Sequence, residues 1–177
     1  MPQLLLFRHA KSDWGDPHLG DFDRPLAKRG KNAAKAMGAY IQTRDLVPHR
    51  ILVSTAARTL ETLSIAAKQW KSQPEVIESR ALYLASAQEM ADQIHALGGK
   101  AERLMVIAHN PGTENLAWAA CGVKPSGDAQ GIAAMGQKFP TAALAVIGFS
   151  GTFWEAVDLQ AGSLHSFKRP KDLADRT

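Results

Sequence analysis

The sequence predicts an α/β protein, a three-layer sandwich in which a mainly parallel sheet is flanked by helices. Short apolar runs of strand length recur along the chain, and most segments between them have the spacing of amphipathic helices. This alternation is typical of parallel sheets, because the connection between two parallel strands is usually a helix. The apolar runs cover residues 4–7, 51–53, 104–108 and 143–149.

Helix boundaries are predicted from capping residues. Ser86 is a candidate N-cap, and Glu89 three residues later completes a capping box. Ser54 or Thr55 is expected to cap the predicted helix that covers residues 55–70. The predicted helices cover residues 27–42, 55–70 and 86–99.

The last third of the chain has a different pattern. Residues 153–159 and 163–170 are short strand-like runs separated by turns that contain glycine. We therefore expect at least one edge strand to run antiparallel, and residues 171–177 to form a polar tail.

Length and composition predict a single domain over residues 1–177, because 177 residues with 45% hydrophobic side chains suffice for one sizeable core. The run 4–7 is too short for a signal peptide, and no apolar run approaches membrane-spanning length. The lone Cys121 can form no intrachain disulfide. We expect a cytoplasmic protein with no membrane partner.

The charge balance favours acidic or phosphorylated ligands. Lys and Arg number 21 against 17 Asp and Glu, a formal net charge of +4. Nucleic acid is not the expected partner, because no stretch combines aromatic and basic residues. The basic residues that do gather lie on one predicted helix: Lys28, Arg29, Lys31 and Lys35.

Arginine and histidine side chains lie where the predicted strands end. Arg8 and His9 close the first run, and His109 follows the run 104–108 directly. Arg58 lies on the opening turn of the helix after the second run. Because ligands bind at the carboxyl ends of parallel strands, we expect these four side chains to converge on one edge of the sheet.

The residue types gathered at this edge favour a phosphate. The planar guanidinium group of arginine matches phosphate oxygens bidentately, and the helix after Ser54 would point free N–H groups at the same place. A neutral imidazole can attack phosphorus, while a second, protonated imidazole can stabilise the phosphoryl oxygens. No metal is expected, because arginines beside His9 would repel a cation and the other histidines lack ligand spacing. Those histidines are His18, His49, His95 and His165.

The blocks "LFRHAKS", "RPLAKRG", "STAART" and "AHNPG" stand in family order, and the chain resembles the histidine phosphatase superfamily, specifically its SixA-type bacterial phosphohistidine phosphatases. This phosphoglycerate mutase-like resemblance spans nearly the whole chain. It implies that His9 is the nucleophile and that His109 completes the pocket and stabilises the transition state. It further implies that Arg8 and Arg58 bind the phosphoryl group, that Asn110 bonds a loop or the phosphate, and that no cofactor is used.

Two positions depart from the superfamily's pattern. Ala10 stands where the superfamily usually has glycine, and alanine would fit badly if the backbone there needed a positive φ. Larger members carry a glutamate proton donor, whereas the comparable stretch here, residues 81–89, has Glu89 as its nearest carboxylate. Glu89 is therefore the candidate proton donor, although its sequence context is that of a capping-box residue.

The predicted reaction is hydrolysis of a phosphate ester or phosphoramidate through a phosphorylated histidine. A phosphohistidine on another protein is the favoured substrate, because its imidazole leaving group needs little help from an acid and the short chain leaves the pocket open. Two alternatives remain: a phosphatase for small phosphate esters, and a non-catalytic regulatory module that binds phosphate.

Structural roles compete with these assignments at several positions. Arg8 and His9 could form an ion pair with Asp13 or Asp21, and Arg58 could pair with Glu61 on its own helix. The polar loop 11–24 is interpreted as a lid or rim loop, because its aspartates lack the spacing of a calcium loop.

Overall fold

The computed structural model describes residues 1–174, in which six strands form one sheet of order β3-β2-β4-β1-β5-β6. β1, β2 and β4 sit next to one another at its centre and have almost completely buried side chains. The strands are β1 (Gln3–Arg8), β2 (Arg50–Ser54), β3 (Glu75–Ser79), β4 (Arg103–Ala108), β5 (Leu144–Gly148) and β6 (Ser163–Lys168).

The sheet is mainly parallel, as predicted. β3, β2, β4 and β1 all run in the same direction, and β5 runs antiparallel to both β1 and β6. The reversed strand is therefore β5, one position in from the edge, whereas we expected the reversal at an edge strand. The edge strand β6 runs in the same direction as β1 because two successive antiparallel pairings restore the original direction.

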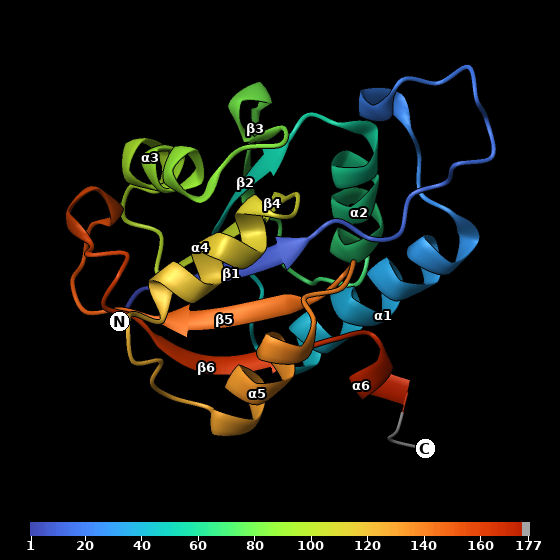
Figure 1. The fold of residues 1–177 in the computed structure, drawn as a ribbon. Helices are drawn as coiled ribbons and strands as arrows, with labels where there is room; N and C mark the ends of the chain where they lie inside the picture. Colours follow the sequence, from blue (N-terminus) through green and yellow to red (C-terminus); the bar gives the residue numbers. More distant parts are fainter. Residues whose placement is uncertain (175–177) are drawn as a thin grey trace.

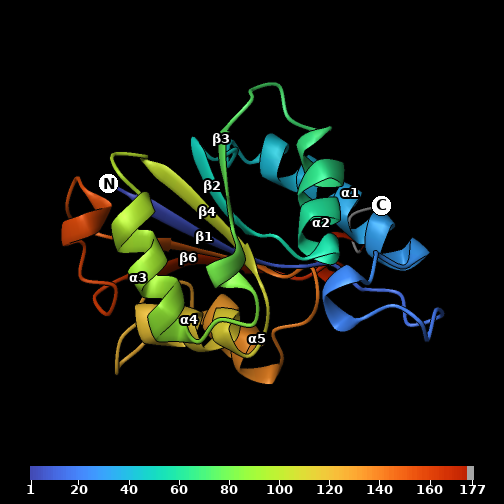
Figure 2. The ribbon, with the colours of Figure 1, turned by 90° about the horizontal axis from the view of Figure 1, so that it is seen from above.

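Helices cover both faces of the sheet, which confirms the three-layer prediction (Figures 1 and 2). Alternate residues of β1 point to opposite faces: Leu5 and Phe7 pack toward α1 and α2, and Leu4 and Leu6 toward α3, α4 and α5. Burying each such side chain contributes about 1.5–3 kcal/mol. The helices are α1 (Lys28–Thr43), α2 (Ala57–Ala67), α3 (Ala87–Leu97), α4 (Gly112–Ala120), α5 (Ala129–Gln137) and α6 (Lys171–Ala174).

Short 3-10 turns, labelled η, correct part of the sequence prediction. Residues 153–159, expected to be strand-like, contain the turn η3 (Trp154–Ala156), in which Trp154 is completely buried and donates a 2.7 Å hydrogen bond to the carbonyl of Ala101. The other turns are η1 (Asp21–Asp23) and η2 (Arg80–Leu82). Within residues 1–174, no helix combines the length and hydrophobicity needed to cross a membrane.

Candidate active site

The catalytic candidates from β1 and β4 meet because these strands are parallel neighbours. Arg8 is the last residue of β1 and pairs with Ala108, the last residue of β4. His9 and His109 follow directly, and their ring centroids lie 5.2 Å apart. Both side chains are buried, His9 at 8% and His109 at 1% exposure. Two imidazoles that are distant in sequence thus share one desolvated position at the carboxyl edge of the sheet.

Two arginines face the same position. Arg58, in the first turn of α2, is 3% exposed, and Arg8 donates a 2.8 Å hydrogen bond through Nη1 to the carbonyl of Phe139. The positive charges of both arginines lower the pKa of His9 and of His109. Among the described residues, the Nε atoms of Arg8 and Arg58 are buried and have no hydrogen-bond partner. Such unpaired cationic donors can bind the oxygens of an anion.

The orientation of the His9 ring is set by the neighbouring residue. Nδ1 of His9 lies 2.7 Å from the carbonyl oxygen of Ala10. A carbonyl only accepts, so Nδ1 carries the proton and Nε2 keeps its lone pair. Burial is the largest cause that lowers the pKa of His9 to about 4, and Arg58 and Arg8 lower it further. The imidazole is therefore neutral at physiological pH.

His109 is held by the end of β2. Its Nε2 lies 2.7 Å from Oγ of Ser54, and its Nδ1 is buried with no partner among the described residues. Ser54 therefore bonds an imidazole instead of capping α2, whose N-cap residue is Ala56, with no side-chain cap. The prediction that Ser54 or Thr55 caps this helix is therefore wrong.

Burial favours the neutral form of the His109 imidazole. Burial, followed by the charge of Arg58 and by His9, lowers the pKa of His109 to about 3. The ring is thus a neutral donor in the unliganded protein. If Ser54 donates to Nε2, the single ring proton lies on Nδ1, where it can be given to a phosphoryl oxygen.

Asp21 connects the loop 11–24 to the site, a contact that the sequence did not predict. Arg58 donates through Nη1 to the Asp21 carbonyl at 2.6 Å and through Nη2 to Oδ2 of its carboxylate at 3.0 Å. Asp21 also accepts from Tyr83 Oη at 2.5 Å and from Arg24 Nη2 at 2.6 Å. Hydrogen bonds from Tyr83 and Arg24 hold the pKa of Asp21 well below its usual range.

The alternative ion pairs expected from sequence are not formed. Arg58 pairs with Asp21 and not with Glu61, which instead lies 3.1 Å from Lys31. Arg8 bonds the carbonyl of Phe139. The carboxylate that orients Arg58 therefore comes from the loop 11–24 and not from α2.

Tyr83 is a second residue that sequence reasoning missed. Its ring stands edge-on to His109 at 5.4 Å and to Phe22 at 4.9 Å. Tyr83 follows β3 and η2, and the exposed, polar strand β3 was not recognised in the sequence. Because this strand was not recognised, the sequence pattern gave no indication that Tyr83 lies at the same edge of the sheet as His109.

The remaining candidates differ in their positions. Asn110 donates to Glu114 at 2.9 Å and to the carbonyl of Phe139 at 3.2 Å, and its Oδ1 is buried without a partner among the described residues. Glu89 is exposed, and its carboxylate accepts from the N–H of Ser86 at 2.7 Å in the predicted capping box. No group of three or more His, Cys, Asp or Glu side chains within residues 1–174 could hold a metal ion.

Alanine fits the position after His9. Ala10 is completely buried, donates its N–H to Thr62 Oγ1 at 3.0 Å, and is not among the non-glycine residues with positive φ. The Ala10→Gly variant should therefore lose about 1 kcal/mol of unfolding free energy, because glycine gains freedom in the unfolded chain and nothing in the fold. Urea denaturation measures this loss. Unchanged or increased stability would contradict the assignment of ordinary backbone geometry at Ala10.

Comparisons with known proteins agree with this geometry. Residues 4–83 match the histidine phosphatase superfamily (branch 1). An uncharacterized protein of Mycobacterium leprae is 30% identical over 167 residues, covering 93% of this chain and 99% of that protein. The chain belongs to the histidine phosphatase superfamily. A second uncharacterized relative, from Mycobacterium tuberculosis, is 32% identical over 164 residues, with the same coverage of 93% and 99%.

Solved structures of histidine phosphatases share the whole fold. A candidate phosphohistidine phosphatase SixA from Agrobacterium tumefaciens is 27% identical, with a TM-score of 0.78 over 96% of this chain and 99% of that one. A candidate SixA from Nakamurella multipartitia is 26% identical, with a TM-score of 0.78 over 96% of each chain. The protein histidine phosphatase SixA complexed with tungstate, at 20% identity and a TM-score of 0.74 over 97% and 99%, supports the fold alone.

Proposed function

We propose that this protein is a metal-independent phosphatase that works through a phosphorylated His9 and removes phosphate from phosphohistidine on another protein. The observation that carries the proposal is the hydrogen bond from His9 Nδ1 to Ala10, which leaves Nε2 as a free nucleophile. This nitrogen stands in a buried site with two arginines whose Nε donors are unpaired. A phosphoryl group would place its phosphorus at Nε2 of His9 and its oxygens at the unpaired donors of Arg8 and Arg58.

The first chemical step transfers the phosphoryl group to the enzyme. Nε2 of His9 attacks phosphorus, the bond from phosphorus to the leaving group breaks, and the electron pair leaves with that group. Arg8 and Arg58 bind the phosphoryl oxygens through their free N–H groups, and His109 donates from Nδ1. Water then attacks phospho-His9 and releases phosphate, which restores the neutral imidazole.

The leaving group favours a phosphohistidine over an alkyl ester. An alkoxide leaving group needs a proton donor, which contributes about 10²- to 10⁴-fold in rate. Glu89 is the candidate donor, but its carboxylate is held by the Ser86 N–H at 2.7 Å. An imidazole leaving group is far less basic, so it departs without such help. Likeness above 25% identity to two candidate SixA structures also supports this substrate.

Three substrates test the proposed function. A carrier protein phosphorylated on histidine, para-nitrophenyl phosphate and 3-phosphoglycerate are each incubated with the native protein in EDTA, and phosphate release is measured. We expect kcat/KM for the phosphohistidine to exceed that for 3-phosphoglycerate by about 10² or more, because only the ester needs a proton donor and such a donor contributes about this factor in rate. Preference for 3-phosphoglycerate would favour a small-ester phosphatase. If none of the substrates is hydrolysed but phosphate still raises the thermal stability of the protein, the protein is a non-catalytic module that binds phosphate.

The pH dependence of kcat/KM should reflect the desolvated nucleophile. His9 attacks only when unprotonated, and its pKa is lowered to about 4, so activity should be lost as the pH falls through that value. Turnover of para-nitrophenyl phosphate between about pH 3 and pH 8 measures this midpoint. A midpoint near the ordinary histidine pKa of about 6.5 would contradict the proposed state of His9.

Circular dichroism at each pH is the necessary control. The folded-state pKa values of His9 and His109 lie below the unfolded value, so the unfolded chain binds protons first. Stability is therefore fully present above about pH 6.5 and falls as the pH drops toward 4. Loss of activity counts as titration of His9 only where the fold persists.

A further inference from the structure

Exposed apolar side chains stand at the mouth of the candidate active site. Trp14 is 69% exposed and Leu84 is 56% exposed. The Trp14 ring covers the Arg24 guanidinium at 3.5 Å, and Arg24 in turn bonds Asp21. Leu84 follows Tyr83, whose ring contacts His109. Trp14 and Leu84 thus lie next to residues that surround the site, although within residues 1–174 no polar or ring contact joins either side chain to His9, His109, Arg8 or Arg58.

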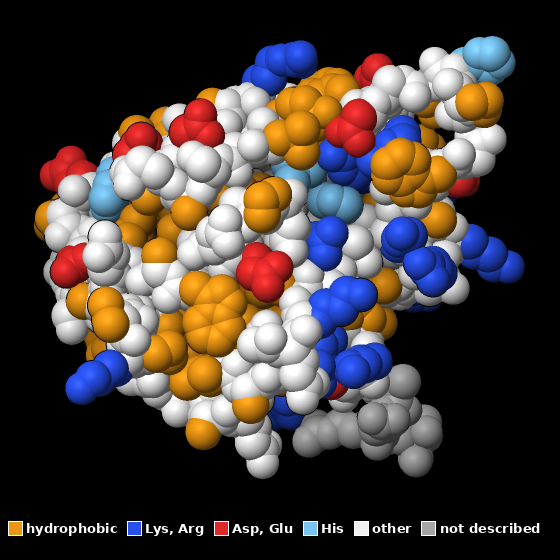
Figure 3. Space-filling view, viewed as in Figure 1, with side chains coloured by type: hydrophobic (Ala, Val, Ile, Leu, Met, Phe, Trp, Pro, Cys, Tyr) orange, Lys and Arg blue, Asp and Glu red, His pale blue; other side chains and the backbone are white. Residues whose placement is uncertain are grey.

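The space-filling view shows the same arrangement. In Figure 3, histidine side chains lie in a hollow of the surface, with hydrophobic side chains on both sides and Lys and Arg side chains below. Phe22 is half-buried and packs edge-on against Tyr83, the residue before Leu84, at 4.9 Å. Exposed apolar side chains therefore lie at the mouth together with the charged ones, although a small, charged substrate would not need them.

Leu84 has an unfavourable backbone conformation for its exposure. Its φ is 52°, in the left-handed region, where the Cβ of a leucine is crowded by its own backbone. Asn or Gly would occupy this position with less strain. More than half of the Leu84 side chain is exposed, so the isolated protein gains little burial energy in return for this backbone conformation. Strain of this kind at the edge of a site is typical of a binding function.

The charge beside the rim limits what can bind there. Arg8 lies at the end of β1, Lys11 follows in the loop, and Lys138 precedes Phe139, whose carbonyl holds Arg8. Within residues 1–174 neither Lys11 nor Lys138 forms an ion pair. On the other side of the rim, Asp13 precedes Trp14 and Asp23 follows Phe22. The positive charge is therefore confined to the Arg8 side, and the complementary surface is apolar with carboxylates opposite Lys11 and Lys138.

We propose that this rim, formed by Trp14, Phe22 and Leu84 beside Lys11 and Lys138, is the docking surface for the folded protein that carries the phosphohistidine. That protein presents the phosphorylated side chain from an apolar surface flanked by Asp or Glu. The inference rests on the proposed function, and it assigns substrate recognition to residues that contact the substrate's protein surface but not the phosphoryl group.

The test compares two substrates with the same scissile bond. The Trp14→Ala/Leu84→Asn variant is assayed on the histidine-phosphorylated carrier protein and on free phosphohistidine. We expect kcat/KM for the carrier to fall about tenfold or more, as for central apolar interface residues, while kcat/KM for free phosphohistidine stays within about twofold. Leu84→Asn alone should also lower kcat/KM for the carrier, which separates the rim from any effect of Trp14 on Arg24.

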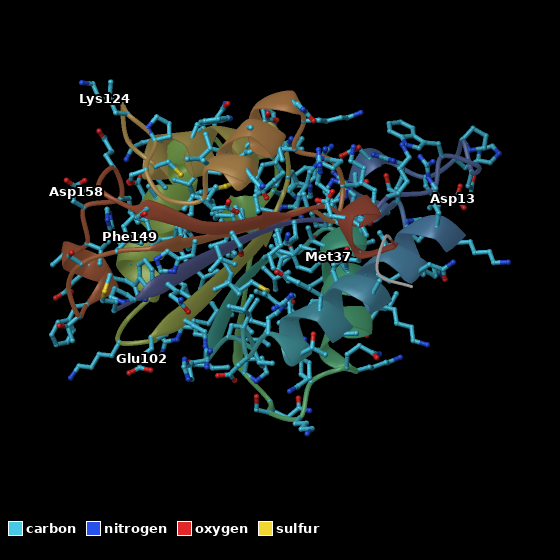
Figure 4. All side chains as sticks on the ribbon, turned by 90° about the horizontal axis from the view of Figure 1, so that it is seen from below. Asp13, Met37, Glu102, Lys124, Phe149 and Asp158 are labelled. Carbon is cyan, nitrogen blue, oxygen red and sulfur yellow. The ribbon has the colours of Figure 1, made fainter. Side chains whose placement is uncertain are left out.

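Val123→Asn is the matched control, because Val123, like Leu84, is an exposed aliphatic residue but follows the far end of α4. Figure 4 labels its neighbour Lys124 and, at the opposite end of the molecule, Asp13 beside Trp14. This control should change neither rate.

Each other outcome overturns the inference. Equal losses on both substrates would mean that the rim supports catalysis, and no loss on either would mean that it is not used. Binding to phosphatidylglycerol vesicles that the double variant loses, with carrier turnover unchanged, would assign the rim to a lipid surface. If the native protein hydrolyses neither substrate, the proposed function fails first, and this result is distinct from failure of the docking surface alone.

Discussion

His9→Ala should abolish turnover of every substrate, with a loss of at least about 10³-fold, because no covalent intermediate can form without the nucleophilic nitrogen. In the native protein, rapid quenching during turnover of a ³²P-labelled phosphohistidine carrier should trap label on the chain, and the label should be stable to alkali but labile to acid. The variant should carry none. Phosphate release and label retention are measured on the same samples.

His18→Ala provides the matched control for this experiment. His18 lies in the exposed part of the loop 11–24, and its ring has no hydrogen-bond partner among the described residues. The substitution should therefore leave both turnover and labelling unchanged. Labelling that survives in His9→Ala would place the nucleophile elsewhere and contradict the mechanism. Thermal unfolding of both variants checks that loss of activity is not loss of fold.

Arg58→Lys should lower kcat/KM by about 10² or more, the usual cost of removing an oriented donor from a charged transition state. Arg58 bonds Asp21 through both Nη atoms while its Nε is free for the phosphoryl group. A lysine ammonium keeps the charge, but its donors all lie on one nitrogen. It therefore cannot bind Asp21 and the phosphoryl group in the geometry of the planar guanidinium. Steady-state kinetics with the phosphohistidine carrier measure the loss.

Asp21→Asn separates orientation from charge. An asparagine accepts fewer strong hydrogen bonds from Arg58 but leaves the guanidinium in place, so we expect a smaller loss of about tenfold. The double variant Arg58→Lys/Asp21→Asn should lose less than the sum of the two single effects, because both changes disrupt one unit. Full additivity, or faster turnover in Asp21→Asn, would contradict the orienting role of Asp21.

The central strands could be predicted because burial on both faces leaves no alternation. Leu4, Leu5 and Leu6 are all completely buried, so β1 is a continuous apolar run in the sequence. β3 could not be predicted in this way. It lies at the sheet edge, where Glu75 and Glu78 are exposed, and it has no apolar run.

The site could be predicted where it depends on strand ends and not where it depends on loops. His9 and His109 meet because β1 and β4 pair in register, and an α/β pattern implies a common edge. The hydrogen bond between Arg58 and Asp21 instead depends on the path of the loop 11–24. This path cannot be predicted from hydrophobic periodicity, because the loop has none. Ser54 was assigned to a helix cap because a local role is the default for a serine before a helix.

The pairing of β1 with β4 also determines when the protein can become active. The ribosome releases the N-terminal strand first, yet one of its ladder partners is β4 and the other is β5, later still in the chain. His9 therefore emerges before the segment that carries His109, and the pocket cannot assemble until both β4 and β5 have been synthesised. Non-local pairing of this kind forms slowly. On refolding from denaturant, catalytic activity should return after the helices have re-formed, so the nascent chain passes through synthesis without an active pocket.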